Sequence, residues 1–260
     1  MLEDGFYFSY GYDVTASRQR RLNWMKNGSK KDQLSLLACD KNYFWNFSMY
    51  QDFIKNQINP KWFTPLMQGY LGQVSGAIDG HKVQVTLISR RMHKKWGSQK
   101  INRGIDDQGY VANQVEKEQI LIVDDKQMAS HVQLSGSVPV FWEQKGLKEG
   151  ITITRSPALT KPAFRKHVAD VFETYNSLTI INLLRYMKKS KEMTITTEYV
   201  RQYSESEFRD KINFVNFDFH GYCGNERYHN MKAMIHRTAD RISADGWLVE
   251  NLGSKLVEAH

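Results

Sequence analysis

The chain has 260 residues, of which 41% are hydrophobic, and it carries a formal net charge of +8. The length and hydrophobic content allow a substantial core, and six Trp, thirteen Tyr and thirteen Phe argue against a disordered chain. Two cysteines are too few for a disulfide framework, which favours a reducing compartment. The sequence contains no apolar run long enough to span a membrane, and its first residues, MLEDGFYFSYGYD, do not resemble a signal peptide.

The positive charge is concentrated in one segment. Between residues 90 and 103 the sequence has six cations and no acid, namely Arg90, Arg91, Lys94, Lys95, Lys100 and Arg103. Nucleic acid, anionic lipid and phosphorylated inositol all fit such a segment, so the sequence predicts a polyanionic partner. A solvated charged loop is the alternative interpretation.

The N-terminal third mixes aromatic and polar residues. Residues 6–12 predict a strand, and residues 15–23 predict the start of a helix or a turn, with Arg18, Arg20 and Arg21 exposed. The apolar side chains of residues 43–58 recur at helical spacing, and Pro60 ends this predicted helix.

Strand patterns follow. Residues 66–76 and 82–89 predict two strands joined by a hairpin turn at Asp79-Gly80. Residues 119–123 and 130–141 predict two more, with a turn at residues 124–126. Residues 143–162 contain glycines and prolines and predict a loop.

The remaining sequence alternates helix and strand patterns. Residues 163–175 predict an amphipathic helix, 179–184 a buried strand, 198–209 a weak helix and 214–219 a further strand. Residues 227–243 predict a strong helix, and 247–257 a hairpin. The expected fold class is therefore mixed α/β, with a β-rich first part and the basic segment near the junction of two subdomains.

Seven motifs in order resemble the Sac-domain phosphoinositide phosphatases. The longest are RGIDDQGYVANQVEKEQ at residues 103–119 and HVQLSGSVPVFWEQ at residues 131–144. The others are FYFSYGYDVTASRQR (6–20), YFWN (43–46), LISRR (87–91), TIINLL (179–184) and FDFHGYC (217–223).

The resemblance implies a two-part architecture and a reaction. Residues 1–91 would be the later part of a β-rich N-terminal subdomain, and residues 92–260 the first part of a catalytic subdomain with a cysteine-phosphatase-like core. The family removes a phosphate monoester from a phosphatidylinositol phosphate, with a cysteine thiolate as nucleophile and no metal or other cofactor. Implied partners are phosphoinositide lipids and an anionic membrane surface. No nucleic-acid partner is expected, because the aromatic residues are dispersed through core-like positions and the sequence has no recognition motif. The implied location is cytoplasmic and peripheral on endomembranes.

The family's catalytic loop, a cysteine followed by five residues and an arginine, is missing from the sequence. Trp45 stands at the arginine position after Cys39, and His229 stands there after Cys223. The loop would then lie beyond His260, and the chain as it stands would be inactive. A non-catalytic phosphoinositide-binding module is the alternative, and a poorly folding fragment is a third.

Candidate substrate-binding residues are the cations of the basic segment, Arg91, Lys94, Lys95, Lys100 and Arg103. They would attract an inositol phosphate or an anionic membrane. Two departures from the family pattern, Ser135 in place of arginine and Lys117 in place of threonine, alter the charge around the implied site.

Candidate residues behind the site are Asn113, Glu116 and Glu118, which would position it. Hydrogen-bonded structure at a loop–strand boundary is the favoured alternative for each. Asp218 and His220 are expected to share one face of a strand as a structural pair, and the histidines and Cys223 lack a zinc-binding spacing.

Overall fold

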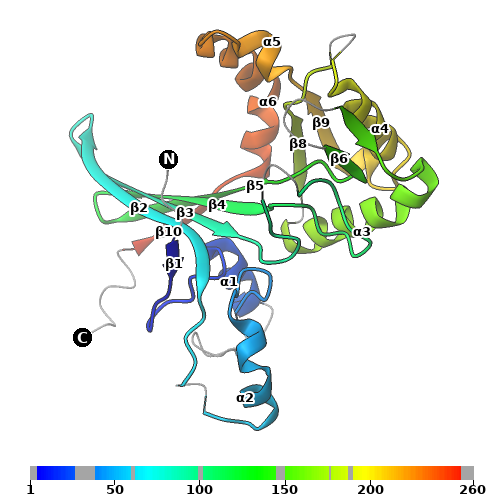
Figure 1. Cartoon of the computed structure of the whole chain (residues 1–260). Coiled ribbons are helices and arrows are strands. Elements are labelled where there is room, and N and C mark those ends of the chain that lie inside the picture. The colour runs from blue at the N-terminus through cyan, green and yellow to red at the C-terminus, as the bar shows by residue number, and fades with distance from the viewer. Residues whose placement is uncertain are drawn as a thin grey trace. The chain divides into compact units, whose positions relative to one another are not determined.

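The computed structural model describes residues 5–26, 39–59, 62–98, 102–144, 150–175, 177–186 and 190–252 (Figure 1). The chain forms two compact units, and its fold class is mixed α/β as expected. The first unit consists of Met1–Lys94, Gln114–Ser135 and Trp247–His260, and the second of Lys95–Asn113 and Gly136–Gly246. The chain passes from the first unit to the second after Lys94 and later returns, so each unit combines separate stretches.

A six-stranded antiparallel sheet forms the first unit. Its strands, in spatial order, are β1 (Gly5–Tyr7), β2 (Met67–Ile78), β3 (His81–Arg91), β4 (Val115–Val123), β5 (Gln127–Ser135) and β10 (Leu248–Asn251). The long β2–β3 hairpin is cyan in Figure 1.

Two tight turns set the register of this sheet. Asp79 and Gly80 connect β2 to β3 with φ angles of 51° and 81°. Asp124 and Asp125 connect β4 to β5 with φ angles of 51° and 56°. Positive φ at both central residues matches the right-handed twist of a hairpin, and aspartate and glycine tolerate it. Both predicted turns are confirmed.

One apolar cluster packs against the sheet. It contains buried Val14, Met67 and Ile88, with Tyr7 and Ile120 packed against them. The helix α1 (Arg18–Lys26) begins shortly after Val14 in the sequence and belongs to the first unit. The prediction that Arg18, Arg20 and Arg21 are exposed is wrong, because Arg20 is only 7% exposed and the other two are half-buried.

A second cluster in the first unit is aromatic. Phe44 and Phe63 are buried, and Tyr50 lies edge-on to Phe63 with ring centres 4.9 Å apart. The single helix predicted for residues 43–58 is instead a 3-10 turn (Phe47–Tyr50) followed by the short helix α2 (Gln51–Lys55).

The second unit combines helices with two small sheets. Its helices are α3 (Pro157–Tyr175), α4 (Met193–Ser204), α5 (Phe219–Cys223) and α6 (Met231–Asp245). Its strands are β6 (Trp142–Gln144) and β7 (Ile151–Ile153), which are antiparallel, and β8 (Leu178–Asn182) and β9 (Ile212–Asn216), which are parallel.

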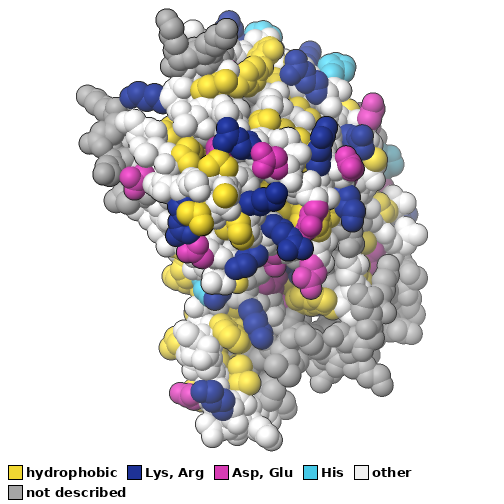
Figure 2. Space-filling view, turned by 90° about the vertical axis from the view of Figure 1, so that its right-hand side faces the viewer, with side chains coloured by type: hydrophobic (Ala, Val, Ile, Leu, Met, Phe, Trp, Pro, Cys, Tyr) yellow, Lys and Arg dark blue, Asp and Glu magenta, His cyan; other side chains and the backbone are white. Residues whose placement is uncertain are grey.

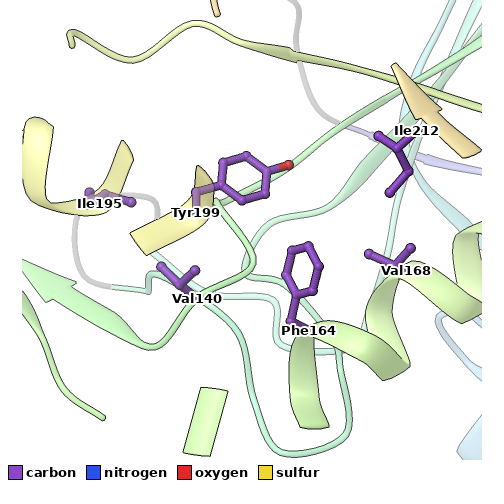
Figure 3. Packing of buried hydrophobic residues seen from close by; sticks show 6 residues of the cluster. All are labelled: Val140, Phe164, Val168, Ile195, Tyr199 and Ile212. Atoms are coloured by element: carbon purple, nitrogen blue, oxygen red, sulfur yellow. The ribbon is translucent and has the colours of Figure 1, made fainter. Parts of the chain in front are cut away.

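The core of the second unit lies between α3, α4 and β9 (Figure 3). Six buried residues form it: Val140, Phe164, Val168, Ile195, Tyr199 and Ile212. The apolar periodicity that predicts a helix over residues 163–175 supplies Phe164 and Val168 to this core, which confirms that helix.

Several predicted boundaries are wrong. The predicted loop 143–162 contains β7 and the start of α3, because a proline such as Pro157 is tolerated at the first helical position. The predicted strand 130–141 ends at Ser135, and the weak helix predicted at 198–209 is α4, which begins at Met193. The hairpin predicted at 247–257 is a strand, β10, that pairs with β5, and residues 253–257 lie outside the described residues.

Candidate functional site

A cavity of about 860 Å³ lies within the second unit. Its charged lining consists of three cations, Arg103, Arg185 and Lys191, and one carboxylate, Glu192. The polar and aromatic lining includes Asn102, Asn113, Ser137, Gln144, Ser190 and Trp142. The excess of cations favours an anionic ligand.

One wall of the cavity is formed by the segment 102–113. Its backbone is held by Ser137, whose hydroxyl accepts the Gly104 amide at 2.8 Å and whose amide donates to the Ala112 carbonyl at 3.0 Å. Gly104 has a φ of 67°, and a Cβ there would lie 2.5 Å from the Val140 carbonyl oxygen. Only glycine fits this close approach, and it brings Arg103 to the cavity.

Arg103 and Asn113 are the two predicted site residues that line the cavity. The Arg103 guanidinium lies 5.6 Å from the centre of the Trp142 ring, within cation–π range. Asn113 has a φ of 54°, and its Oδ1 accepts the Gly97 amide at 3.3 Å. Asn113 therefore connects the cavity wall to Gly97, in the middle of the basic segment.

Another part of the wall comes from the connection between β8 and α4. Glu192 accepts the backbone amide of Arg185 at 2.8 Å through its Oε2 atom, and its own amide donates to the Ser190 hydroxyl at 3.2 Å. The first bond links Arg185 to the end of the connection that precedes α4, and the second is local to that end. The side chains of Arg185 and Lys191 are exposed. Neither was singled out in the sequence, where no motif marks them.

The other predicted cations are distributed between the units. Arg91 and Lys94 belong to the first unit and Lys95 to the second, and all three are half-buried. Lys100 lies outside the described residues. Figure 2 shows one face of the molecule, on which Lys and Arg side chains are interspersed with Asp and Glu. On that face the net positive charge does not form one continuous basic area.

Glu116 and Glu118 lie in a fully buried ion network of the first unit. Arg90 donates from Nη1 to Glu116 at 3.1 Å and from Nη2 to Glu118 at 2.7 Å. Arg20 forms an ion pair with Glu116, and the Arg18 backbone amide donates to Glu118 at 2.8 Å. These contacts agree with the interpretation of both glutamates as hydrogen-bonded structure.

Arg90 was grouped with the basic segment, and its burial was missed in the sequence. Burial opposes its charge, but Glu116 and Glu118 outweigh that effect and raise the pKa of Arg90. The sequence signal for this buried network is the alternation of Glu116 and Glu118 along a strand, because alternation places both side chains on one face of the sheet. Register then sets Arg90 directly opposite Glu116.

Neither cysteine is placed as a nucleophile. Burial, together with nearby Asp13, raises the pKa of the Cys39 thiol to about 12, so the reactive thiolate is not populated near neutrality. Cys223 is also buried, at the end of α5.

Asp218 and His220 do not share a strand face, because β9 ends at Asn216. Asp218 instead caps α5, where its Oδ1 accepts the Gly221 amide at 2.7 Å. This is a structural role. No group of three or more His, Cys, Asp or Glu side chains among the described residues is arranged to hold a metal ion.

The model of one family, the SacI homology domain, matches residues 1–224. The chain belongs to this family. The resemblance carried by the seven motifs is therefore confirmed.

Three relatives of this Sac-family chain have names that describe phosphoinositide phosphatases. It is 31% identical over 280 residues to the phosphatidylinositide phosphatase SAC2 of Danio rerio, covering 95% of this chain and 24% of that protein. The chain is 28% identical over 260 residues to the phosphatidylinositol-3-phosphatase SAC1-A of Danio rerio, and the match covers 98% of this chain and 43% of that protein. The chain is 31% identical over 260 residues to the phosphoinositide phosphatase SAC7 of Arabidopsis thaliana, and the match covers 98% of this chain and 42% of that protein.

The Sac-family chain spans less than half the length of these relatives. Within the described residues, no helix combines the length and apolarity that crossing a bilayer requires.

Proposed function

We propose that this chain supplies phosphoinositide recognition to a Sac-family phosphatase and does not hydrolyse the phosphate by itself. The observation that carries the proposal is the cavity of the second unit, whose charged lining consists of three cations and one carboxylate. The names of the relatives support an inositol phosphate as the anion.

The binding residues proposed are Arg91, Lys94, Lys95, Lys100 and Arg103. Arg103 lines the cavity and is suited to bind two phosphoryl oxygens at once. The lysines attract the anionic membrane surface, where each nearby cation contributes about 1 kcal/mol.

Asn113 positions the site through its bond to the Gly97 amide. We also assign a supporting role behind the site to Glu116 and Glu118, which anchor β4 to Arg90 on β3 within the first unit. The assignment of residues 1–91 to the family's N-terminal subdomain and of 92–260 to its catalytic subdomain belongs to the same proposal. We place the protein in the cytoplasm, peripheral on endomembranes, with phosphoinositide lipids as its partners.

The hydrolytic step needs a thiolate that attacks phosphorus, displaces the inositol oxygen and forms a phosphocysteine, which water then cleaves. It also needs backbone N–H groups around the phosphate and an arginine on its oxygens. Cys39 does not meet these requirements, since its thiol is buried and stays protonated. Neither cysteine has an arginine six positions later.

A non-catalytic binding module is the second candidate. The burial of both cysteines favours it, because within the described residues neither thiol is exposed to act as the nucleophile, whereas cations such as Arg103 line the cavity. The two candidates share the binding step and differ in whether further catalytic groups join it.

The test is vesicle co-sedimentation with a phosphate-release assay on the same samples. We expect the chain to bind vesicles containing phosphatidylinositol 4-phosphate more tightly than phosphatidylcholine vesicles, with affinity falling as salt rises. The variant Lys94→Ala/Lys95→Ala should weaken binding, whereas Lys55→Ala, on the exposed helix α2, should not. Equal binding to both vesicle types refutes the recognition role.

Phosphate release separates binding from catalysis. We expect none from the wild-type chain. Turnover that persists in the variant Cys39→Ser/Cys223→Ser would contradict the cysteine-based mechanism, and turnover lost in that variant would contradict our assignment of both thiols as inert.

A further inference from the structure

Three exposed arginines of the second unit are not neutralised by any carboxylate. They are Arg227, Arg237 and Arg241, and none of them forms an ion pair among the described residues. We propose that these arginines, the arginine surface, dock the protein on an anionic lipid bilayer. The inference goes beyond the proposed function, because none of the three lines the cavity.

Two of the arginines lie against the short helix α5. The Arg227 guanidinium donates from Nε to the Gly224 carbonyl at 2.9 Å and from Nη2 to the Gly221 carbonyl at 3.4 Å. The Arg237 guanidinium lies 6.0 Å from the centre of the Tyr222 ring, and Tyr222 directly follows Gly221 on α5. These contacts place both guanidinium groups against adjacent residues of α5, and carbonyls and a ring leave their charges in place.

Arg241 extends this surface along α6. It stands four residues after Arg237, and side chains four apart on a helix are neighbours. Two like charges at this spacing destabilise a helix. The stretch 227–241 contains one acid, Asp240, and no salt bridge within the described part of the chain joins it to either arginine. An anionic surface over the two arginines would relieve their repulsion.

Another side of α6 anchors the helix in the second unit. Thr238 is buried, Met234 and Ile242 are half-buried, and α6 packs on β8 and β9. The helix is drawn in orange to red in Figure 1. The arginine surface is therefore carried by a helix that is fixed to the parallel strands rather than by a loop.

Charge and the accompanying side chains favour a bilayer as the occupant. Anionic lipids attract exposed cations without requiring a particular arrangement of donors. Tyrosine is enriched at membrane interfaces, because its ring is apolar and its hydroxyl is polar. Tyr222 is 37% exposed and Tyr228, which directly follows Arg227, is 58% exposed. A second copy of the chain is a poorer match, because it would present the same cations to this surface.

The experiment is co-sedimentation of the full chain with vesicles of phosphatidylcholine and phosphatidylserine that contain no phosphoinositide. Wild type should bind them, with affinity falling as salt rises. The variant Arg237→Gln/Arg241→Gln removes both charges and retains residues that are good helix formers. It should weaken binding about tenfold or more, because each cation near an anionic surface contributes roughly fivefold in affinity.

Lys161→Gln/Arg165→Gln is the matched control, because it removes the same charge from exposed positions on α3 of the same unit. It should weaken binding by less than about threefold, the effect expected of net charge at a distance. Arg237→Lys/Arg241→Lys should stay within about threefold of wild type, since a bilayer attracts point charges as well as guanidinium forks. Unchanged thermal unfolding midpoints check that all three variants fold.

Three results would overturn the arginine surface as a bilayer contact. Equal losses in the glutamine variant and the α3 control would show that net charge alone drives binding. Loss of binding in the lysine variant would indicate recognition by guanidinium forks, which a bilayer does not require. Binding to soluble polyglutamate without binding to vesicles would assign the surface to an acidic protein.

The same vesicles separate this inference from the proposed function. If wild type prefers phosphoinositide vesicles but the glutamine variant keeps its affinity for phosphatidylserine, the recognition role stands and the arginine surface is refuted. If the glutamine variant loses phosphatidylserine binding but wild type shows no preference for phosphoinositide, the recognition role fails and the arginine surface stands.

Discussion

Replacement of Arg90 by methionine should destabilise the first unit more than any loss of a surface charge. The Arg90 guanidinium donates to the Val14 carbonyl at 2.8 Å and to the Ala16 carbonyl at 3.2 Å, in addition to its bonds with Glu116 and Glu118. The side chains of Arg90 and both glutamates are fully buried. The variant Arg90→Met keeps an apolar stem and removes every one of these donors.

The magnitude follows from the charges left behind. Removal of one partner from a buried ion pair costs about 3–5 kcal/mol, because the remaining charge is neither hydrated nor paired. Arg90 has two such partners, although Arg20 continues to pair with Glu116. We therefore expect a loss of about 3–5 kcal/mol, which is a large part of the roughly 5–15 kcal/mol that stabilises a typical domain.

Lys82→Met is the matched control on the same strand. Lys82 pairs with Asp125 at 2.7 Å, but both side chains are more than 60% exposed. An exposed pair contributes about 0–1 kcal/mol. Urea unfolding followed by circular dichroism should show a large loss for Arg90→Met and almost none for Lys82→Met. Similar losses in the two variants would refute the view that burial makes the Arg90 network important.

Two further predictions concern pH and close packing. Burial lowers the pKa of His167 from 6.5 to about 4. Between these two pH values the unfolded chain binds a proton that the folded chain does not. The free energy of unfolding should therefore fall by up to about 3 kcal/mol as the pH drops through this range. His167→Asn, which keeps a donor for the Gly109 carbonyl, should flatten this dependence in urea unfolding at about pH 7.5 and about pH 5, and an equally steep variant would contradict the assignment. A Cβ at Gly69 would lie 1.7 Å from the Ser89 carbonyl oxygen, so Gly69→Ala should lower the unfolding free energy by about 1–3 kcal/mol. Gly76→Ala, on the same strand with open space around it, should change it by less than about 0.5 kcal/mol, and equal effects would refute the packing argument.

Local signals in the sequence were sufficient for part of the fold. The β2–β3 hairpin was predicted from two alternating runs around Asp79-Gly80, because both signals act within a few residues. The order of seven motifs identified the family, and the family model matches residues 1–224. The core helix α3 followed from its apolar spacing, although its start at Pro157 did not.

Pairings between distant segments were not predictable in this way. The last strand, β10, pairs with β5 across more than 100 residues, whereas the local pattern indicated a hairpin. The first turn of α4 was also not predicted. Its buried residue Ile195 packs in a core with residues of α3 and β9, and these contacts between distant segments are not visible in the local sequence.

The sequence by itself determined the family, the mixed α/β class, the two hairpin turns and the absence of a cysteine loop, because each depends on residue identity at short spacing. Only the tertiary structure decided which charges are buried and which line the cavity. Arg90 and Arg91 are neighbours in one basic segment, yet strand alternation buries the first against Glu116 and leaves the second half-exposed. Arg103 and Arg185 are far apart in the chain and line one cavity. Burial and proximity also depend on register and packing between distant segments, so a local pattern such as alternation is not sufficient to decide either.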